Sequence, residues 1–212
     1  LVEACADRHQ VVYFNPHKDV DEQFAGIDIV ADHGGTAGHR KLYEAGKRHG
    51  VKHWQIIGSG LDHIDLESLL SMGFTVSNLP SKDHAIPLAE HVIFMMLFRY
   101  RNYNETRRCL ETGQVFLPTN EELFDKTLGL VGFGATGREV AKRAHAFGMK
   151  ILAVDVQTIN KSTQDEFHLE YFGSPNEIDR ILKASDCFSI HVPLTSATRH
   201  MISRNSFALM EP

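Results

Sequence analysis

Long apolar runs and paired cysteines are both missing from this sequence of 212 residues. Its longest uninterrupted apolar stretch, Val92 to Phe98, is much shorter than the ~20 residues that span a bilayer, which argues against a membrane partner. The three cysteines, Cys5, Cys109 and Cys187, are far apart and form no C-x-x-C pair. This argues against a disulfide framework and a zinc site, and it favours a reducing compartment, the cytoplasm.

The sequence also lacks metal-ligand spacing and basic clusters. Its 13 histidines include no H-E-x-x-H or other paired pattern, so we expect most of them at the surface and no metal site. The net charge is −5 with neutral histidines, and lysines and arginines are scattered, which argues against a nucleic-acid partner. With 42% hydrophobic and 23% charged residues, the composition is that of an ordinary globular protein.

Short β-rich stretches alternate with helical ones along the whole chain, which predicts an α/β fold with parallel sheets. Gly50 and Gly73 are placed to end helices, and Asp65 is placed to begin one. For the first region, the pattern predicts strands over 11–15, 27–33, 53–58 and 74–78, and helices over 37–49 and 66–72.

A helix is expected from Leu88 onward, after a loop bracketed by Pro80 and Pro87. Apolar residues cover most of its circumference, so it is predicted to be buried on all sides, between two domains. The polar stretch 99–120 is expected to run over the surface. These features predict a domain over 1–86 and a second over 87–212.

For the second domain, the pattern predicts a buried strand before Gly132 and a helix that ends at Gly148. A second strand follows, then a polar loop over 157–166. The remaining prediction is a short strand near 168–173, a helix over 175–184 and a strand over 186–191.

One Gly-x-Gly-x-x-Gly, at Gly132, Gly134 and Gly137, joins the first of these strands to its helix. Alone it is weak evidence, because glycines also make simple tight turns. In this strand–loop–helix context Gly132 permits the turn, Gly134 lets a pyrophosphate approach the backbone, and Gly137 lets the helix pack closely. The amides near Ala135 and Thr136, with the helix dipole, favour phosphate binding.

Asp155 stands 18 residues beyond the third glycine, at the end of the next strand. A carboxylate there can bind both hydroxyls of an adenosine ribose and would repel a 2′-phosphate, so NAD is predicted in preference to NADP. A purely structural alternative is that Asp155 caps the loop at its strand end.

Several stretches together resemble the D-isomer-specific 2-hydroxyacid dehydrogenases, a family that includes phosphoglycerate and glyoxylate/hydroxypyruvate dehydrogenases. The stretches are GSGLDHIDL (58–66), GFTVSNLP (73–80), AEHVIFMML (89–97), 126–155 and SDCFSIHVPLTSATRHMIS (185–203). The resemblance implies a flavodoxin-like substrate domain and a Rossmann NAD-binding domain. It also implies a homodimer that acts on a small 2-hydroxy or 2-keto acid.

The resemblance assigns roles to two further segments. The backbone amides of Ser59, Gly60 and Leu61 are expected to hold the substrate carboxylate, although a simple strand-to-helix turn would show the same glycines. The segment His191, Val192 and Pro193 is expected to line the cofactor cleft, although a strand that ends at His191 explains it about as well. Ala135-Thr136 departs from the Arg-Ile that the family often has there, which predicts weaker cofactor contact at most.

The family's catalytic Arg, Glu and His are expected beyond the position that matches Pro212, so no catalytic residue is assigned. The family's first strand and the nicotinamide half of the Rossmann sheet are also expected to be missing. The resemblance therefore implies an NAD-dependent 2-hydroxyacid dehydrogenase whose 212-residue chain alone is inactive. The alternative is a non-catalytic NAD-sensing scaffold, like the corepressors that share this fold.

Overall fold

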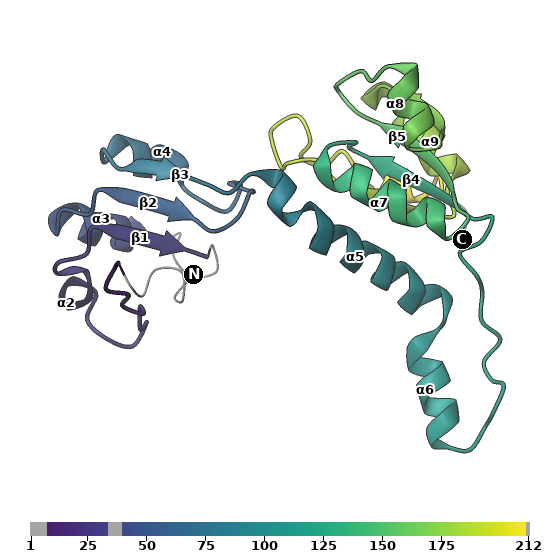
Figure 1. Cartoon of the computed structure of the whole chain (residues 1–212), viewed down its shortest axis with the longest axis horizontal. Helices are drawn as coiled ribbons and strands as arrows, with labels where there is room; N and C mark the ends of the chain where they lie inside the picture. The colour runs from purple at the N-terminus through teal and green to yellow at the C-terminus, as the bar shows by residue number, and fades with distance from the viewer. Residues whose placement is uncertain (1–7, 34–39, 211–212) are drawn as a thin grey trace. The chain divides into compact units, whose positions relative to one another are not determined.

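The computed structural model describes residues 8–33 and 40–210. The chain divides into two compact units, Leu1–Leu79 and Pro80–Pro212, each with a parallel sheet of its own (Figure 1). Within the described ranges, no helix combines the length and the apolar character that crossing a membrane requires.

The first unit is built on a sheet of order β1-β2-β3. Its elements are α2 (Val20–Phe24), β1 (Ile29–Asp32), α3 (Arg40–Arg48), β2 (His53–Ile56), α4 (Leu66–Ser71) and β3 (Thr75–Ser77). Alternation along β2 turns Trp54 and Ile56 into the core. Trp54 is fully buried against the rings of Tyr43 and Phe74, at centroid distances of 5.0 and 5.6 Å. Its Nε1 donates to Oδ2 of the buried Asp32 at 3.0 Å.

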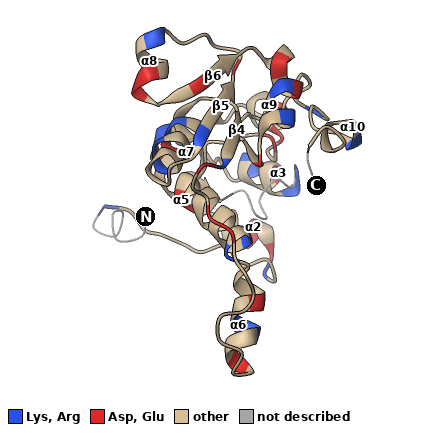
Figure 2. Ribbon diagram, turned by 90° about the vertical axis from the view of Figure 1, so that its right-hand side faces the viewer, with Lys and Arg blue, Asp and Glu red and all other residues tan. Residues whose placement is uncertain are grey.

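The second unit has a four-stranded parallel sheet of order β6-β5-β4-β7. Its helices and strands follow in chain order: α5 (Ser81–Tyr100), α6 (Tyr103–Glu111), β4 (Thr127–Val131), α7 (Ala135–Ala146), β5 (Lys150–Val154), α8 (Lys161–Glu166), β6 (Leu169–Gly173), the 3-10 helix η1 (Pro175–Glu177), α9 (Ile178–Ala184), β7 (Cys187–Ile190) and α10 (Arg204–Phe207). Side chains of both charge signs lie along α6 and α8 (Figure 2).

Both faces of this second sheet are covered by helices, as parallel sheets require. Leu128 and Leu130 of β4 face a cluster built with α5 and α7. Gly129, between them, faces α9, where an added Cβ would lie 2.5 Å from side-chain atoms of Ile181 and Ser185. The predicted α/β class with parallel sheets is confirmed, and it brings the ends of β4, β5 and β7 together.

Several local predictions were wrong. Residues 11–15 form no strand and are exposed, because no strand among the described residues pairs with them. The stretch 157–166 was predicted to be a loop but includes α8, whose first turn is capped by Asn160. The polar stretch 99–120 is largely exposed, as predicted, and it includes α6. Of the helix predicted over 37–49, residues 37–39 lie outside the described residues.

The long helix α5 also differs from its prediction. It begins at Ser81, not at Pro87, and Pro87 lies inside it. The two compact units divide at Leu79/Pro80, directly before the start of α5. The helix is not buried on all sides: Ala89 and Ile93 pack towards α7, while Phe94 and Met95 are about half exposed (55% and 51%). One apolar face of α5 is therefore not covered by other residues of the second unit.

Candidate functional site: the carboxyl edge of the second sheet

The glycine loop leaves β4 at Val131 and enters α7 at Ala135. Gly132 has φ of +98°, which side chains rarely adopt, and a Cβ there would lie 2.6 Å from the carbonyl oxygen of His191. A Cβ at Gly137 would collide with the carbonyl oxygen of Gly132. These two glycines are therefore required by the close packing of strand, loop and helix.

Gly134 differs from its two partners, because an added Cβ there would meet nothing within 4 Å. Gly134 is exposed and is the N-cap of α7, yet no side chain among the described residues caps this helix. The backbone N–H groups of Gly134, Ala135, Thr136 and Gly137 have no acceptor in the part of the chain that the structure describes. Uncapped amides beside open space at a helix N-terminus make an anion site that suits a pyrophosphate.

Asp155 lies directly after β5, whose residue Val154 pairs with Val131 of β4. Its Oδ2 accepts the N–H of Phe133, inside the glycine loop, at 2.6 Å, and its Oδ1 accepts the N–H of Gln157 at 2.8 Å. Asp155 therefore caps the loop, as the structural alternative had it. A carboxylate has about four acceptor positions, so capacity for ribose hydroxyls remains and the two roles are compatible.

The segment 191–193 follows β7, at the same edge. The amide of His191 donates to Val131 O at 2.7 Å, which places the segment beside the glycine loop. Burial lowers the pKa of His191, and no described group hydrogen-bonds to its buried Nε2. Val192 and Pro193 line a cleft of about 210 Å³. An unpartnered buried nitrogen beside the loop is a group that a ligand hydroxyl could satisfy.

Two threonines that sequence reasoning missed hold this segment. The hydroxyl of Thr198 donates to Pro193 O at 2.6 Å, and it accepts the amide of Thr195 at 2.8 Å. The signal was present as two threonines three residues apart after a proline, a spacing typical of hydroxyl-capped turns. These hydrogen bonds give the 193–198 turn a defined shape beside the cleft that Val192 and Pro193 line.

The first unit holds the loop of Ser59, Gly60 and Leu61 after β2. Asn78 Nδ2 donates to Ser59 O at 3.0 Å, and the amide of Leu79 donates to Gly58 O at 3.0 Å, so the loop is tied to the chain after β3. Among the described residues, no group accepts the N–H of residues 59, 60 or 61. Free consecutive amides can bind a carboxylate.

In the second unit, a parallel sheet, a three-glycine loop, an uncapped helix N-terminus and a strand-end aspartate meet at one edge. Together they define a dinucleotide-binding α/β domain. Residues 93–212 match the family described as "D-isomer specific 2-hydroxyacid dehydrogenase, NAD binding domain". The chain belongs to this family, as the motifs had indicated, and NAD is the cofactor of its domain.

Individual proteins similar to this chain are dehydrogenases or reductases of the same family. The chain is 37% identical over 187 residues to a hydroxypyruvate reductase of Thermotoga maritima, covering 87% of this chain and 58% of that protein. It is 33% identical over 192 residues to a D-3-phosphoglycerate dehydrogenase of Methanocaldococcus jannaschii, covering 90% and 35%. The structure of a D-lactate dehydrogenase from Aquifex aeolicus, complexed with NAD and lactic acid, matches with a TM-score of 0.78 at 26% identity, covering 99% of this chain and 62% of that one. The chain thus spans between 35% and 62% of the length of these relatives.

Proposed function

We propose that this chain is part of an NAD-dependent oxidoreductase that transfers hydride between the cofactor and C2 of a D-2-hydroxy acid or its 2-keto acid. The observation that carries the proposal is the uncapped N-terminus of α7 beside the open space at Gly134, with Asp155 at the neighbouring strand end. The names of the relatives, which include hydroxypyruvate reductase and glyoxylate reductase, support a small 2-keto acid as substrate.

In this proposal the second unit binds NAD. The amides of Gly134, Ala135, Thr136 and Gly137 receive the pyrophosphate, and Gly132 permits the turn that aims them. Asp155 receives the adenosine ribose. These assignments place one anionic group at a helix N-terminus and one sugar at a carboxylate, which suits each chemistry.

The segment of His191, Val192 and Pro193 borders the cofactor on its other side. The unpartnered Nε2 of His191 is available to a ribose hydroxyl, while Val192 and Pro193 offer an apolar wall. The departure at Ala135-Thr136 removes a long side chain from the loop, and the amides remain.

The first unit is proposed to bind the substrate. The free amides of Ser59, Gly60 and Leu61, at the end of a parallel strand, form a nest for its carboxylate. When bound, NAD supplies the hydride acceptor or donor, and the protein orients the reactants. In this proposal no residue of the chain is assigned the proton transfer.

We also propose that the protein is a cytoplasmic homodimer. Support for a dimer comes from an exposed apolar surface of the second unit on α5, α6 and the segments after them. It comprises Phe94, Met95, Tyr103, Leu110, Val115, Phe116, Leu117, Phe124 and Phe147. Phe116 is 95% exposed. These side chains are 41–95% exposed, and an aromatic side chain buries about 150–250 Å² when fully covered, so this surface can supply a large part of the ~800 Å² per partner of a stable interface.

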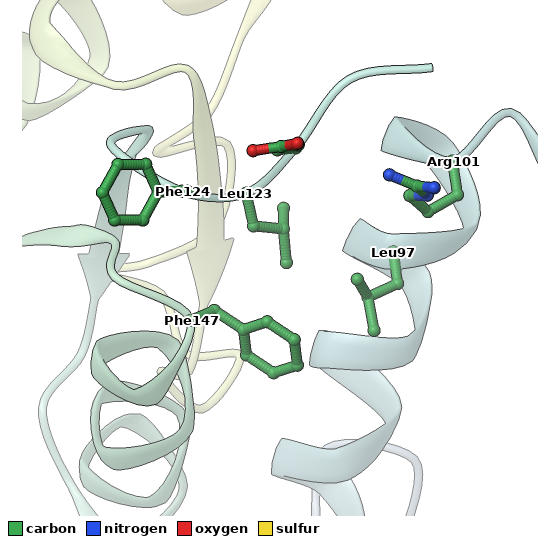
Figure 3. Close-up of a pocket in the computed structure, with 6 residues that line it drawn as sticks. Leu97, Arg101, Leu123, Phe124 and Phe147 are labelled. Atoms are coloured by element: carbon green, nitrogen blue, oxygen red, sulfur yellow. The ribbon is translucent and has the colours of Figure 1, made fainter. Parts of the chain in front are cut away.

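A hollow of about 340 Å³ belongs to this same surface. It lies between the end of α5, the segment 122–124 and the end of α7, with the side chains of Leu97, Leu123 and Phe147 turned towards it (Figure 3). It lies outside the glycine-loop site. Four of its six lining residues are apolar and the other two are Arg101 and Glu122, so its apolar part offers a seat for a side chain of the second copy.

Turnover by the natural full-length protein tests the proposed function. The protein is given NADH with glyoxylate, hydroxypyruvate or 3-phosphohydroxypyruvate in turn, and the loss of NADH absorbance is monitored. We expect oxidation of NADH with at least one of these substrates. Tight NAD binding without turnover of any 2-keto acid would favour the non-catalytic NAD-sensing alternative. Absence of NAD binding would contradict both.

A further inference from the structure

Arg138 stands one residue after the third glycine and turns its side chain back onto the glycine loop. Its Nε donates to the carbonyl oxygen of Phe133 at 3.2 Å. Its guanidinium carbon lies 5.6 Å from the ring centres of both Phe133 and Phe167. Among the described residues Arg138 has no ion pair, whereas Lys142 and Arg143 on the same helix both pair with Glu139.

Phe133 is held at each of its polar atoms and at its ring. Its N–H donates to Asp155, and its carbonyl accepts from Arg138. Phe133 is 2% exposed, and its ring packs edge-on against Phe167 at a centroid distance of 5.3 Å. The residue between the first two glycines of the loop is therefore locked, although its neighbours have the conformational freedom of glycine.

This lock determines where the next amide points. A trans peptide is planar, and its C=O and N–H point in opposite directions. Because Arg138 holds the Phe133 carbonyl on the side of α7, the N–H of Gly134 points to the other side. Gly134 is exposed and has open space around the position of a Cβ.

We propose that Arg138 is a positioning residue for the cofactor: it holds the Phe133–Gly134 peptide in the orientation that presents the Gly134 N–H to the pyrophosphate. This inference rests on the proposed NAD site at the glycine loop. Arg138 acts through the peptide and does not touch the cofactor. Without its hydrogen bond the peptide can rotate, because Gly134 permits both orientations, and a carbonyl oxygen would then face the phosphates.

Two variants of Arg138 and one control separate this role from a general effect on folding. Arg138→Met keeps an apolar stem against Phe133 and Phe167 and removes the donor. Arg138→Lys keeps the charge and a donor. Lys142→Met is the matched control, since Lys142 lies on the same helix with its Nζ 5.5 Å from the ring centre of Phe167.

The measurement is the dissociation constant of NAD, ADP and adenosine for the natural full-length protein, by calorimetry. We expect Arg138→Met to weaken the affinity for NAD and for ADP about tenfold, which is the effect of losing one charge-assisted hydrogen bond. The affinity for adenosine should be unchanged. Arg138→Lys should recover part of the affinity, and Lys142→Met should bind like the wild type. The Gly134 amide signal in a ¹H–¹⁵N spectrum should shift with ADP in the wild type and not in Arg138→Met.

Several results would overturn the proposal. Three outcomes for Arg138→Met each contradict a role through that amide: unchanged affinity for ADP, equal loss of affinity for adenosine and ADP, or an ADP-dependent shift of the Gly134 signal. If Arg138→Met does not fold, the Gly134 amide of the wild type decides: a Gly134 signal that ADP does not shift contradicts the role. A wild type that binds neither NAD nor ADP overturns the proposed function itself, a different result from an unaffected variant.

Discussion

The backbone N–H of Phe133 donates a hydrogen bond of 2.6 Å to the carboxylate of Asp155, across the ends of two paired strands. The residue proposed to bind the ribose is thus also a clamp on the loop proposed to bind the pyrophosphate. The two halves of the cofactor site are mechanically joined before any ligand arrives.

Asp155→Ala should therefore weaken the binding of NAD and lower the ratio of NAD affinity to NADP affinity. We expect a loss of about tenfold to a hundredfold in NAD affinity, because charge-assisted hydrogen bonds contribute roughly 1.5–3 kcal/mol each. Asp155→Asn keeps an acceptor for the N–H of Phe133 and removes the charge. It should therefore keep the stability of the folded protein and lose the preference for NAD over NADP. Asp165→Ala, on α8, serves as the control. An unchanged ratio of NAD to NADP affinity in Asp155→Ala would remove Asp155 from the ribose role.

The three glycines of the loop should respond differently to alanine. Gly137→Ala forces a Cβ onto the carbonyl oxygen of Gly132, and backbone cannot yield cheaply, so we expect destabilisation of roughly 1–3 kcal/mol. Gly134→Ala meets no atom and should fold like the wild type, but its methyl occupies the space intended for the pyrophosphate. Thermal unfolding and NAD calorimetry on both variants check this. Equal NAD affinity in Gly134→Ala and wild type would contradict the phosphate site.

The strand–loop–helix unit could be predicted from the sequence because local pattern determines it. Gly137 and Asp155 each have a role set by neighbours in the same β-α-β unit, whereas Gly132 also packs against His191 beyond β7. The family could be recognised from motifs spread over most of the chain. What was missed depends on contacts that local pattern does not reveal: the hydrogen bond of Arg138 to the carbonyl of Phe133, and that of Thr198 to the carbonyl of Pro193.

The errors have equally physical causes. Residues 11–15 have β propensity, but a strand also needs a partner for its backbone, which propensity does not reveal. The helix α5 was predicted to be buried all round because its composition is apolar. Composition does not say whether the cover comes from the same unit, and Phe94 and Met95 remain exposed.

That exposed surface leads to a prediction about assembly. Phe94→Asp together with Phe116→Asp should convert a dimer into a monomer, since charges placed in an apolar interface are strongly unfavourable. Leu70→Asp, at a comparably exposed position on α4 in the first unit (55%), should leave the dimer intact. Sedimentation velocity at micromolar concentration distinguishes the species. A monomeric wild type would contradict the proposed homodimer.

His191 should make the stability of the protein depend on pH. Burial lowers its pKa in the folded state, so between that value and the ordinary 6.5 the unfolded chain binds more protons. Stability should rise with pH through this window and be lost as pH falls below about 6.5. His191→Gln cannot titrate and should show a smaller decrease. Urea unfolding at pH 7.5 and 5.5, monitored by circular dichroism, measures this decrease in the free energy of unfolding. An equal decrease in the wild type and in His191→Gln would contradict the assignment.

Cys187 offers a chemical check on the packing of the second sheet. Burial raises the pKa of its thiol from 9.0 to about 11, with the charge of Asp186 adding to the effect. At pH 8 the thiolate is then about a hundredfold scarcer than for an ordinary cysteine, and the thiolate is the species that reacts. We expect iodoacetamide to label Cys187 at least a hundredfold more slowly in the folded protein than in urea, by mass spectrometry of its peptide.

Cys109 provides a comparison within the same molecule. It is buried, at 5% exposure, whereas Cys187 is partly buried, but Cys109 lies on α6, which carries the exposed apolar surface and projects from the sheet (Figure 1). Labelling of Cys109 that outpaces Cys187 would show that α6 opens before the sheet does, because slow-reacting thiols report the local free energy of opening. Rapid labelling of Cys187 in the folded protein would contradict the packing of β7 against Met96 of α5, whose Sδ lies 3.5 Å from its Sγ.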